Sequence, residues 1–196
     1  LPKTAWPPTL EKIDILSLSP ETLGQYLAEM GEPKFRAKQL FSWLHQKQVT
    51  DFAQMTTLSL QLRQKLNEKF CINRLNIARK LASSADDTVK YLYELPDGNF
   101  VETVLMDYHH GKSLCISTQV GCRMGCRFCA SAIAGFVRNL TPAEMLLQIY
   151  ETERAQNCKI SSLVLMGIGE PLDNFDNVLR FLQRKVHRQY HRICKK

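Results

Sequence analysis

The stretch that decides the fold is residues 113–129, SLCISTQVGCRMGCRFC, where alternating apolar and polar residues lead directly into three cysteines. The alternation predicts a strand over residues 113–120. Leu114 belongs to one face of this strand, and helices packed outside the strand would bury that face. Cys115 belongs to the other face, so we expect its thiol to point toward the concave side of a sheet.

A helix, a second strand and a second helix are expected after this strand. The sequence TPAE at 141–144 supplies a capping threonine, a proline at the first helical position and a glutamate that closes a capping box, which predicts a helix to about residue 156. Residues 162–166, SLVLM, predict a strand buried on both sides, and this strand breaks at the turn 167–171, GIGEP. The next helix is expected over 177–182.

This order of elements predicts an α/β fold with parallel strands. Ligands of such folds bind at the carboxyl ends of the strands. The cysteine-rich loop and the GIGEP turn both follow a strand end. The sequence therefore predicts that these two segments lie side by side.

Four segments are expected along the chain. Residues 1–84 carry apolar residues at helical spacing, with a Ser-Pro helix start at 19–20, and predict a small all-helical domain. Residues 85–108 alternate around an Asp-Gly turn and predict a β-hairpin linker. Residues 109–182 form the α/β unit, and residues 183–196 are a basic tail without a recognisable pattern.

Composition indicates a globular protein of a reducing compartment. The 196 residues are 44% hydrophobic, which excludes a disordered chain. No apolar run approaches the ~18 residues of a membrane span, and the first ten residues lack the layout of a signal peptide, so we expect a cytoplasmic protein without membrane attachment. The seven cysteines are then expected to be ligands, catalytic thiols or buried apolar residues rather than stable disulfides.

The net charge of +7 is unevenly distributed. Residues 1–84 carry 12 basic and 7 acidic residues, residues 85–183 carry 8 and 12, and residues 184–196 carry 6 and none. The helical segment is therefore the candidate surface for the phosphates of a nucleic acid. The alternative is that its basic residues are ordinary solvent-exposed residues of the helix surfaces and bind no nucleic acid.

Cys122, Cys126 and Cys129 form the spacing C-x3-C-x2-C. Zinc sites and ordinary iron–sulfur clusters take four protein ligands, whereas this local set stops at three. Three thiolates on a four-iron cluster leave one iron open to chelate the amino and carboxylate groups of S-adenosylmethionine. A zinc site completed by His109 or His110 is the alternative.

This spacing after one strand, with a Gly-x-Gly-Glu-Pro turn after the next, resembles the radical S-adenosylmethionine superfamily. Within it, residues 115–122 (CISTQVGC), 126–129 (CRFC), 138–140 (RNL) and 166–171 (MGIGEP) resemble the RlmN/Cfr family of RNA adenine methyltransferases. The resemblance covers about residues 12–182. It implies an incomplete radical S-adenosylmethionine (β/α) partial barrel, preceded by the helical domain.

The resemblance also implies a role for each matching residue. The three clustered cysteines match the ligands of a 4Fe-4S cluster, and Gly169 and Glu170 match the turn that binds the amino group of S-adenosylmethionine. Cys115 matches a cysteine that resolves a protein–RNA adduct through a transient disulfide, and Glu102 matches a proton acceptor. Without the resemblance, Cys115 would be interpreted as a small buried thiol and Glu102 as a strand-surface carboxylate.

The implied activity is radical methylation of C2 of an adenine in 23S ribosomal RNA and in tRNA. The implied partners are these RNAs and a reductant protein such as flavodoxin or ferredoxin, with the chain as a monomer. The resemblance stops after Leu182, and nothing around Cys194 matches the family's methyl-carrying cysteine, so we expect a truncated or frame-shifted chain that is inactive alone. A non-catalytic RNA-binding remnant and a zinc-binding module are the alternatives.

Overall fold

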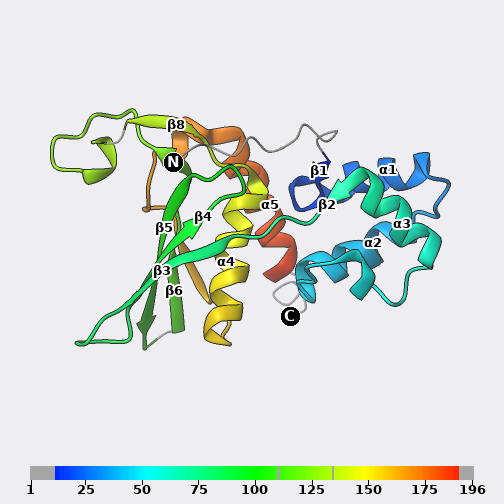
Figure 1. The fold of residues 1–196 in the computed structure, drawn as a ribbon, viewed down its shortest axis with the longest axis horizontal. Helices are drawn as coiled ribbons and strands as arrows, with labels where there is room; N and C mark the ends of the chain where they lie inside the picture. Colours follow the sequence, from blue (N-terminus) through cyan, green and yellow to red (C-terminus); the bar gives the residue numbers. More distant parts are fainter. Residues whose placement is uncertain (1–11, 110, 134, 190–196) are drawn as a thin grey trace, which may run out of the picture. The chain divides into compact units, whose positions relative to one another are not determined.

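The computed structural model describes residues 12–109, 111–133 and 135–189 (Figure 1). The chain divides into two compact units, residues 1–73 and 74–196. No helix in the described part of the chain is both long and apolar enough to cross a membrane.

The first unit contains three α-helices where the sequence predicts them. Ser19 caps the first of these helices through the amide of Thr22, and Ser59 caps the third through that of Leu62. Two short strands also pair in parallel, so this unit is not all-helical as expected. Its elements are β1 (Ile13–Asp14), a 3-10 turn (Ile15–Ser17), α1 (Pro20–Glu29), α2 (Phe35–Phe41), a π-helical turn (Ser42–Gln46), a 3-10 turn (Phe52–Gln54), α3 (Leu60–Lys69) and β2 (Phe70–Cys71).

The second unit contains a five-stranded sheet in the order β3-β4-β5-β6-β9. Only the β6–β9 pair is parallel, as the βαβ prediction requires, and the other neighbours are antiparallel. The strands of this sheet are β3 (Asn76–Ala82), β4 (Val89–Glu94), β5 (Phe100–Tyr108), β6 (Gly111–Cys115) and β9 (Ser162–Val164). The unit also contains the separate antiparallel pair β7 (Gln119–Gly121) and β8 (Phe136–Asn139), the helices α4 (Pro142–Gln156) and α5 (Phe175–Gln189), and 3-10 turns at Ala130–Ala132 and Pro171–Asn174.

Three segment boundaries differ from the sequence expectation. Residues 76–82 are strand β3 and fall in the second unit, although they were expected in the helical domain. The expected hairpin forms between β4 and β5, but it is not a separate linker, because β5 also pairs with β6. The α5 helix continues to Gln189, so helical backbone extends into the segment expected to be an unpatterned tail.

Both predicted core strands are shorter than expected. The strand predicted over 113–120 is divided into β6 and β7, because the backbone of Ser117 bonds to the Gln148 side chain and the amide of Thr118 bonds to the turn after β9. The strand predicted over 162–166 ends at Val164 and is half-buried rather than buried on both sides, since β9 lies at an edge of the described sheet.

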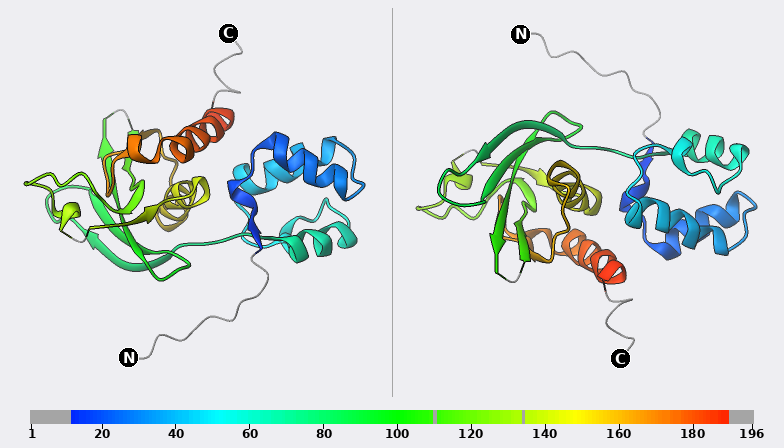
Figure 2. Two further views of the ribbon diagram at one scale, coloured as in Figure 1. Left: turned by 90° about the horizontal axis from the view of Figure 1, so that it is seen from above. Right: turned by 90° about the horizontal axis from the view of Figure 1, so that it is seen from below.

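Helix α4 covers one face of the sheet (Figure 2). The Tyr93 hydroxyl lies 2.8 Å from that of Thr152, and the Thr103 hydroxyl donates to Gln148 at 2.8 Å. Alternate residues of β4 and β5 are buried on this face, whereas their neighbours in sequence, among them Glu102, are half-buried on the other. The capping box predicted at the start of α4 is present, with Thr141 as the cap. The sheet therefore has one covered face and one more open face.

Candidate functional site

The segment 116–119 and the turn 167–170 are joined by backbone hydrogen bonds, and we call this junction the seam. The amide of Gly167 donates to the carbonyl of Ile116 at 3.0 Å, and the amide of Thr118 donates to the carbonyl of Ile168 at 2.9 Å. The segment that leads into the cysteine-rich loop thus lies beside the GIGEP turn, and the loop itself contacts the residues after this turn through the ion pair between Arg123 and Asp173 at 2.9 Å.

Two glycines allow this close approach. A Cβ on Gly167 would lie 2.7 Å from the carbonyl carbon and oxygen of Ile116. Gly169 has a φ of +101°, and a Cβ there would lie 2.5 Å from the Cβ of Gln119. The Gly-x-Gly pattern of the turn is therefore a requirement of the seam itself.

The carboxylate of Glu170 stands at the start of the Pro171–Asn174 turn. Its Oε1 accepts a hydrogen bond from the amide of Leu172 at 3.1 Å, so Glu170 caps this turn. The backbone amide of Glu170 donates to Oε1 of Gln119 at 2.9 Å. Both the backbone and the side chain of Glu170 are thereby fixed by neighbours.

Cys115 and Glu102 share the more open face of the sheet. Cys115 of β6 is paired with Val104 of β5, and Glu102 is two residues from Val104, so all three project to the same side. This orientation agrees with that predicted for the Cys115 thiol. Burial raises the pKa of Cys115, and a hydrogen bond with the backbone of Met166 partly offsets the rise.

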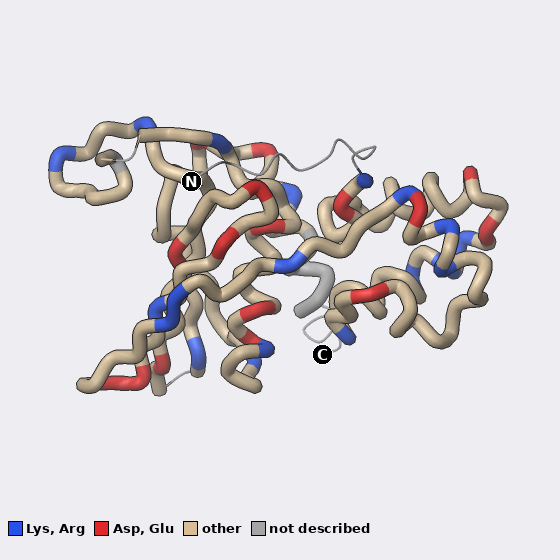
Figure 3. The backbone as a smooth tube through the Cα atoms, viewed as in Figure 1, with Lys and Arg blue, Asp and Glu red and all other residues tan. Residues whose placement is uncertain are grey.

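Glu102 is held at two points. Its carboxylate forms an ion pair with Lys90 at 2.7 Å, and both side chains are partly exposed. Its backbone carbonyl accepts a hydrogen bond from the hydroxyl of Ser117 at 2.6 Å, and the same hydroxyl accepts the amide of Ile168 at 3.0 Å. Ser117 thus connects β5 to the seam. Two further basic residues, Arg79 and Lys80, belong to β3, the strand that pairs with β4 (Figure 3).

The segment between β7 and β8, residues 122–133, carries the three clustered cysteines, and we call it the cysteine loop. The amide of Cys122 donates to the carbonyl of Gly135 at 3.1 Å, and that of Cys129 donates to the carbonyl of Cys126 at 3.1 Å. Cys126 is exposed, and Phe128 is 95% exposed. Cys122 and Cys129 are half-buried, so Cys126 is the most accessible of the three cysteines.

The structure does not gather the three thiols of this loop. Among the described residues, no group of three His, Cys, Asp or Glu side chains lies close enough to hold a metal ion. The type of donor still fits an iron–sulfur cluster, because three free thiols on one short loop can converge on a polynuclear centre. Among the described residues, His109 forms no metal-binding group with these cysteines. His110, the other proposed zinc ligand, lies outside the described residues.

The base of the cysteine loop is anchored by Arg138 of β8. Its guanidinium forms a bidentate pair with Glu144 at 2.7 and 2.9 Å, and its Nε lies 2.6 Å from Oδ2 of Asp97 in the β4–β5 turn. Burial raises the pKa of Asp97, but hydrogen bonds from Arg138 and Asn99 outweigh it and lower the pKa to about 2. Arg138 thereby ties β8, the hairpin turn and the start of α4 together.

Sequence reasoning missed the buried amides that support the seam. Gln148 of α4 accepts the amide of Ser117 at 2.9 Å and donates to its carbonyl at 3.0 Å. Asn174 donates to the carbonyls of Thr118 and Leu140, both at 2.8 Å. Gln148 thus pairs both backbone groups of Ser117 at the break in the strand, and Asn174 joins the end of this segment to the chain just before α4. No local motif marks them, because a polar residue in a helix is usually at the surface.

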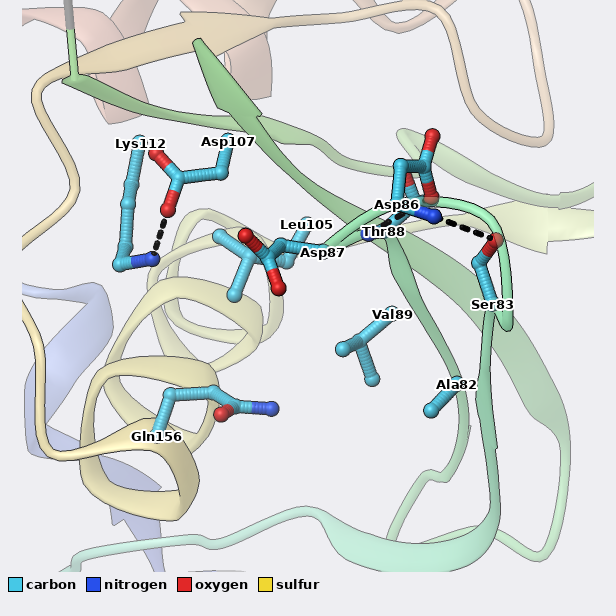
Figure 4. A pocket seen from close by; sticks show the side chains of 10 residues that line it. All are labelled: Ala82, Ser83, Asp86, Asp87, Thr88, Val89, Leu105, Asp107, Lys112 and Gln156. Carbon is cyan, nitrogen blue, oxygen red and sulfur yellow. Dashed lines mark hydrogen bonds and ion pairs between the residues drawn. The ribbon is translucent and has the colours of Figure 1, made fainter. Parts of the chain in front are cut away.

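A separate hollow of about 340 Å³ opens near the other end of the strands (Figure 4). The β3–β4 connection, the ends of β5 and α4 and the start of β6 line it, with Asp86, Asp87 and Asp107 near its rim. Lys112 pairs with Asp107 at 2.5 Å. None of the residues predicted for the functional site lines this hollow.

Comparisons with known proteins match both units. Residues 13–72 match the family model described as the ribosomal RNA large subunit methyltransferase N-terminal domain. A protein of Lachnoclostridium phytofermentans named "Probable dual-specificity RNA methyltransferase RlmN" is 52% identical over 88% of this chain and 49% of its own length. A protein of the same name from Alkaliphilus oremlandii is 51% identical over 89% of this chain and 50% of its own.

A solved structure agrees with these sequence matches. The crystal structure of a radical SAM methyltransferase from Sphaerobacter thermophilus superimposes with a TM-score of 0.80 at 34% identity, over 89% of this chain and 52% of that one. The chain spans about half the length of the curated relatives it matches. Together with the cysteine loop and the seam, these matches show that the chain belongs to the RlmN family.

Proposed function

We propose that the chain carries the cofactor-binding part of an RNA methyltransferase that modifies C2 of an adenine through radical S-adenosylmethionine chemistry. The seam is the observation that supports this most strongly. It bonds the turn proposed for the cofactor's amino group to the strand end that leads into the three clustered cysteines. The same chain thus supplies a place for the cluster and a place for the cofactor next to each other.

In this proposal Cys122, Cys126 and Cys129 hold a 4Fe-4S cluster whose fourth iron is open to S-adenosylmethionine. When bound, the cluster supplies the electron that reduces the sulfonium to a radical. The protein's own part is to orient the cofactor. The Glu170 carboxylate attracts the cofactor's ammonium group, and the amide of Leu172 fixes the direction of that carboxylate.

In this proposal, Cys115 and Glu102 act on the RNA substrate. Glu102 accepts the C2 proton of the adenine, and Lys90 holds its carboxylate on the open face. The Cys115 thiolate would attack the sulfur of a second, methyl-carrying cysteine in the protein–RNA adduct. The bond from that sulfur to the RNA-bound carbon would break, the electron pair would leave with that carbon, and a transient disulfide would remain. Both residues project from the same face of the sheet, which is the side a substrate base would have to reach.

The remaining features of the proposal concern fold and partners. The β6–α4–β9 arrangement is the first part of a (β/α) partial barrel. The substrates are 23S ribosomal RNA and tRNA, with phosphate contacts from the basic first unit. A flavodoxin- or ferredoxin-type protein supplies the electron, and the chain acts as a monomer in the cytoplasm.

Anaerobic reconstitution with iron and sulfide, followed by electron paramagnetic resonance of the reduced protein, tests this proposal. We expect about four irons per chain and a cluster signal that changes when S-adenosylmethionine is added. A cluster signal indifferent to the cofactor would reject the open iron. Tight zinc binding without iron uptake would favour a zinc module, and salt-dependent RNA binding without iron uptake would favour a non-catalytic RNA-binding protein.

A further inference from the structure

The buried side chain of Gln119 lies at the centre of the seam. It is 0% exposed, and its Oε1 accepts the amide of Glu170 at 2.9 Å. Its Nε2 donates to Oδ1 of Asn139 and to Oδ2 of Asp173, both at 2.8 Å. Each polar atom of this amide therefore has a partner, and one partner is the backbone of the residue proposed to bind the cofactor.

Asp173 carries the connection onward to the cysteine loop. Its Oδ2, which accepts from Gln119, also lies 2.9 Å from Nε of Arg123. Arg123 directly follows Cys122 in the sequence, and its guanidinium carbon lies 3.9 Å from the centre of the Phe136 ring. A continuous chain of contacts thus runs from Glu170 through Gln119 and Asp173 to the first residue after a clustered cysteine.

We propose that Arg123, Asp173 and Gln119 form a positioning clamp that sets the start of the cysteine loop relative to Glu170. The inference rests on the proposed function, because it concerns the distance between the cluster and the cofactor's amino group. The clamp touches neither group directly. It acts through the backbone of Cys122 on one side and the backbone amide of Glu170 on the other.

The Arg123 and Asp173 side chains of the clamp are partly exposed to solvent, and this argues against a purely structural role. The Arg123 side chain is 52% exposed and that of Asp173 is 23% exposed. An ion pair this exposed contributes little to the stability of a fold. Removing Arg123 should therefore leave the folded protein and its cluster intact while loosening the geometry on which cofactor binding depends.

The test compares the variants Arg123→Ala and Arg127→Ala in the reconstituted full chain. Arg127 lies on the same loop, is exposed, and forms no ion pair among the described residues, so its removal changes charge alone. We expect both variants to keep the iron content and melting temperature of the wild type. We expect Arg123→Ala to weaken S-adenosylmethionine binding about tenfold by calorimetry, and Arg127→Ala to leave it nearly unchanged.

Two further measurements make the result specific. Asp173→Asn keeps an acceptor for Gln119 but removes the charge that Arg123 meets, so it should also weaken binding. Arg123→Lys restores a charge without the planar stacking on Phe136, so it should recover part of the affinity. An S-adenosylmethionine analogue lacking the α-amino group should bind wild type and Arg123→Ala equally weakly, since the clamp acts on the site for that group.

The outcomes separate the clamp from the proposed function. If the wild type takes up iron and binds S-adenosylmethionine, but Arg123→Ala binds S-adenosylmethionine equally well, the proposed role of the clamp is wrong. The proposed function would then be unaffected. Loss of iron or of folding in Arg123→Ala would also overturn the clamp, because the role would then be structural. If wild type takes up no iron or ignores the cofactor, the proposed function itself fails.

Discussion

The cysteine loop follows one segment of the seam almost directly, but the seam and the loop are built in different ways. In the seam, backbone groups of both segments are paired and a fully buried glutamine connects them. In the loop, Phe128 and Ile133 are 95% and 88% exposed, and the cysteine thiols are not gathered. From this difference we predict that the polypeptide alone fixes the turn proposed for the cofactor, and that the loop becomes ordered when the proposed cluster binds.

The largest effect should come from removing a thiol of the cysteine loop. Cys126→Ser should abolish stable uptake of a four-iron cluster, because two thiolates cannot replace three at such a site. Its thiol is exposed, so the free energy of unfolding of the metal-free protein should change by less than about 0.5 kcal/mol.

Iron analysis and urea unfolding of Cys126→Ser measure these two quantities. Cys71→Ser, which changes a cysteine of the first unit, is the matched control and should retain its iron. Normal iron uptake by Cys126→Ser would refute its role as a ligand.

A substitution in the seam should lower the free energy of unfolding, whereas removal of a thiol from the cysteine loop should lower iron uptake. Gly169 and Gly125 both have a positive φ, of +101° and +67°, but only a Cβ on Gly169 would meet other atoms. Gly169→Ala should lower the free energy of unfolding by about 3 kcal/mol, from a clash added to backbone strain. Gly125→Ala should cost about 1 kcal/mol, from strain alone. Equal losses in urea unfolding would mean that the seam is not tightly packed.

The anchor at the base of the loop should show a defined pH dependence. Because the folded pKa of Asp97, about 2, lies below its usual value, Asp97 stabilises the fold at neutral pH and loses that contribution as the pH falls toward 2. Asp97→Asn should therefore lower the melting temperature by about 2 °C at pH 7, and the difference should shrink near pH 2. A difference that is the same at both pH values would contradict the ion pair with Arg138.

The smallest effect concerns the reactivity of Cys115. Since burial raises its pKa, a smaller fraction of this thiol is ionised at pH 8 than in an unfolded chain. Alkylation by iodoacetamide, followed by mass spectrometry, should be several-fold slower in the folded protein than in urea. Its rate should rise with pH above the usual range for cysteine. An equal rate in both states would contradict the burial of this thiol in the folded protein.

Much of the fold was predictable because local signals agreed with it. The Thr-Pro-Ala-Glu start of α4, the Asp-Gly turn of the hairpin and the Ser-Pro start of α1 all lie where expected. Strand β3 was missed because its seven residues are all exposed, so burial imposes no apolar alternation on it. The division of the 113–120 strand was missed because it depends on the distant Gly167 and Gln148.

In the candidate site, the motif residues could be predicted from the sequence, but the contacts that position them could not. The motif residues Cys115, Cys122 and Glu170 could be chosen from spacing and resemblance, and the sequence order predicted that their segments would meet. The clamp could not be predicted, because Gln119, Asp173 and Arg123 gain significance only through contacts between two segments about fifty residues apart. A single sequence contains no local pattern that marks such contacts.

Hydrogen–deuterium exchange of the metal-free and reconstituted protein tests the contrast between seam and loop most directly. We predict that amides of residues 116–119 and 167–170 are protected in both forms, and that amides of residues 122–133 exchange rapidly until the cluster is present. Rapid exchange across the seam in the metal-free protein, or a cysteine loop already protected without iron, would contradict the account.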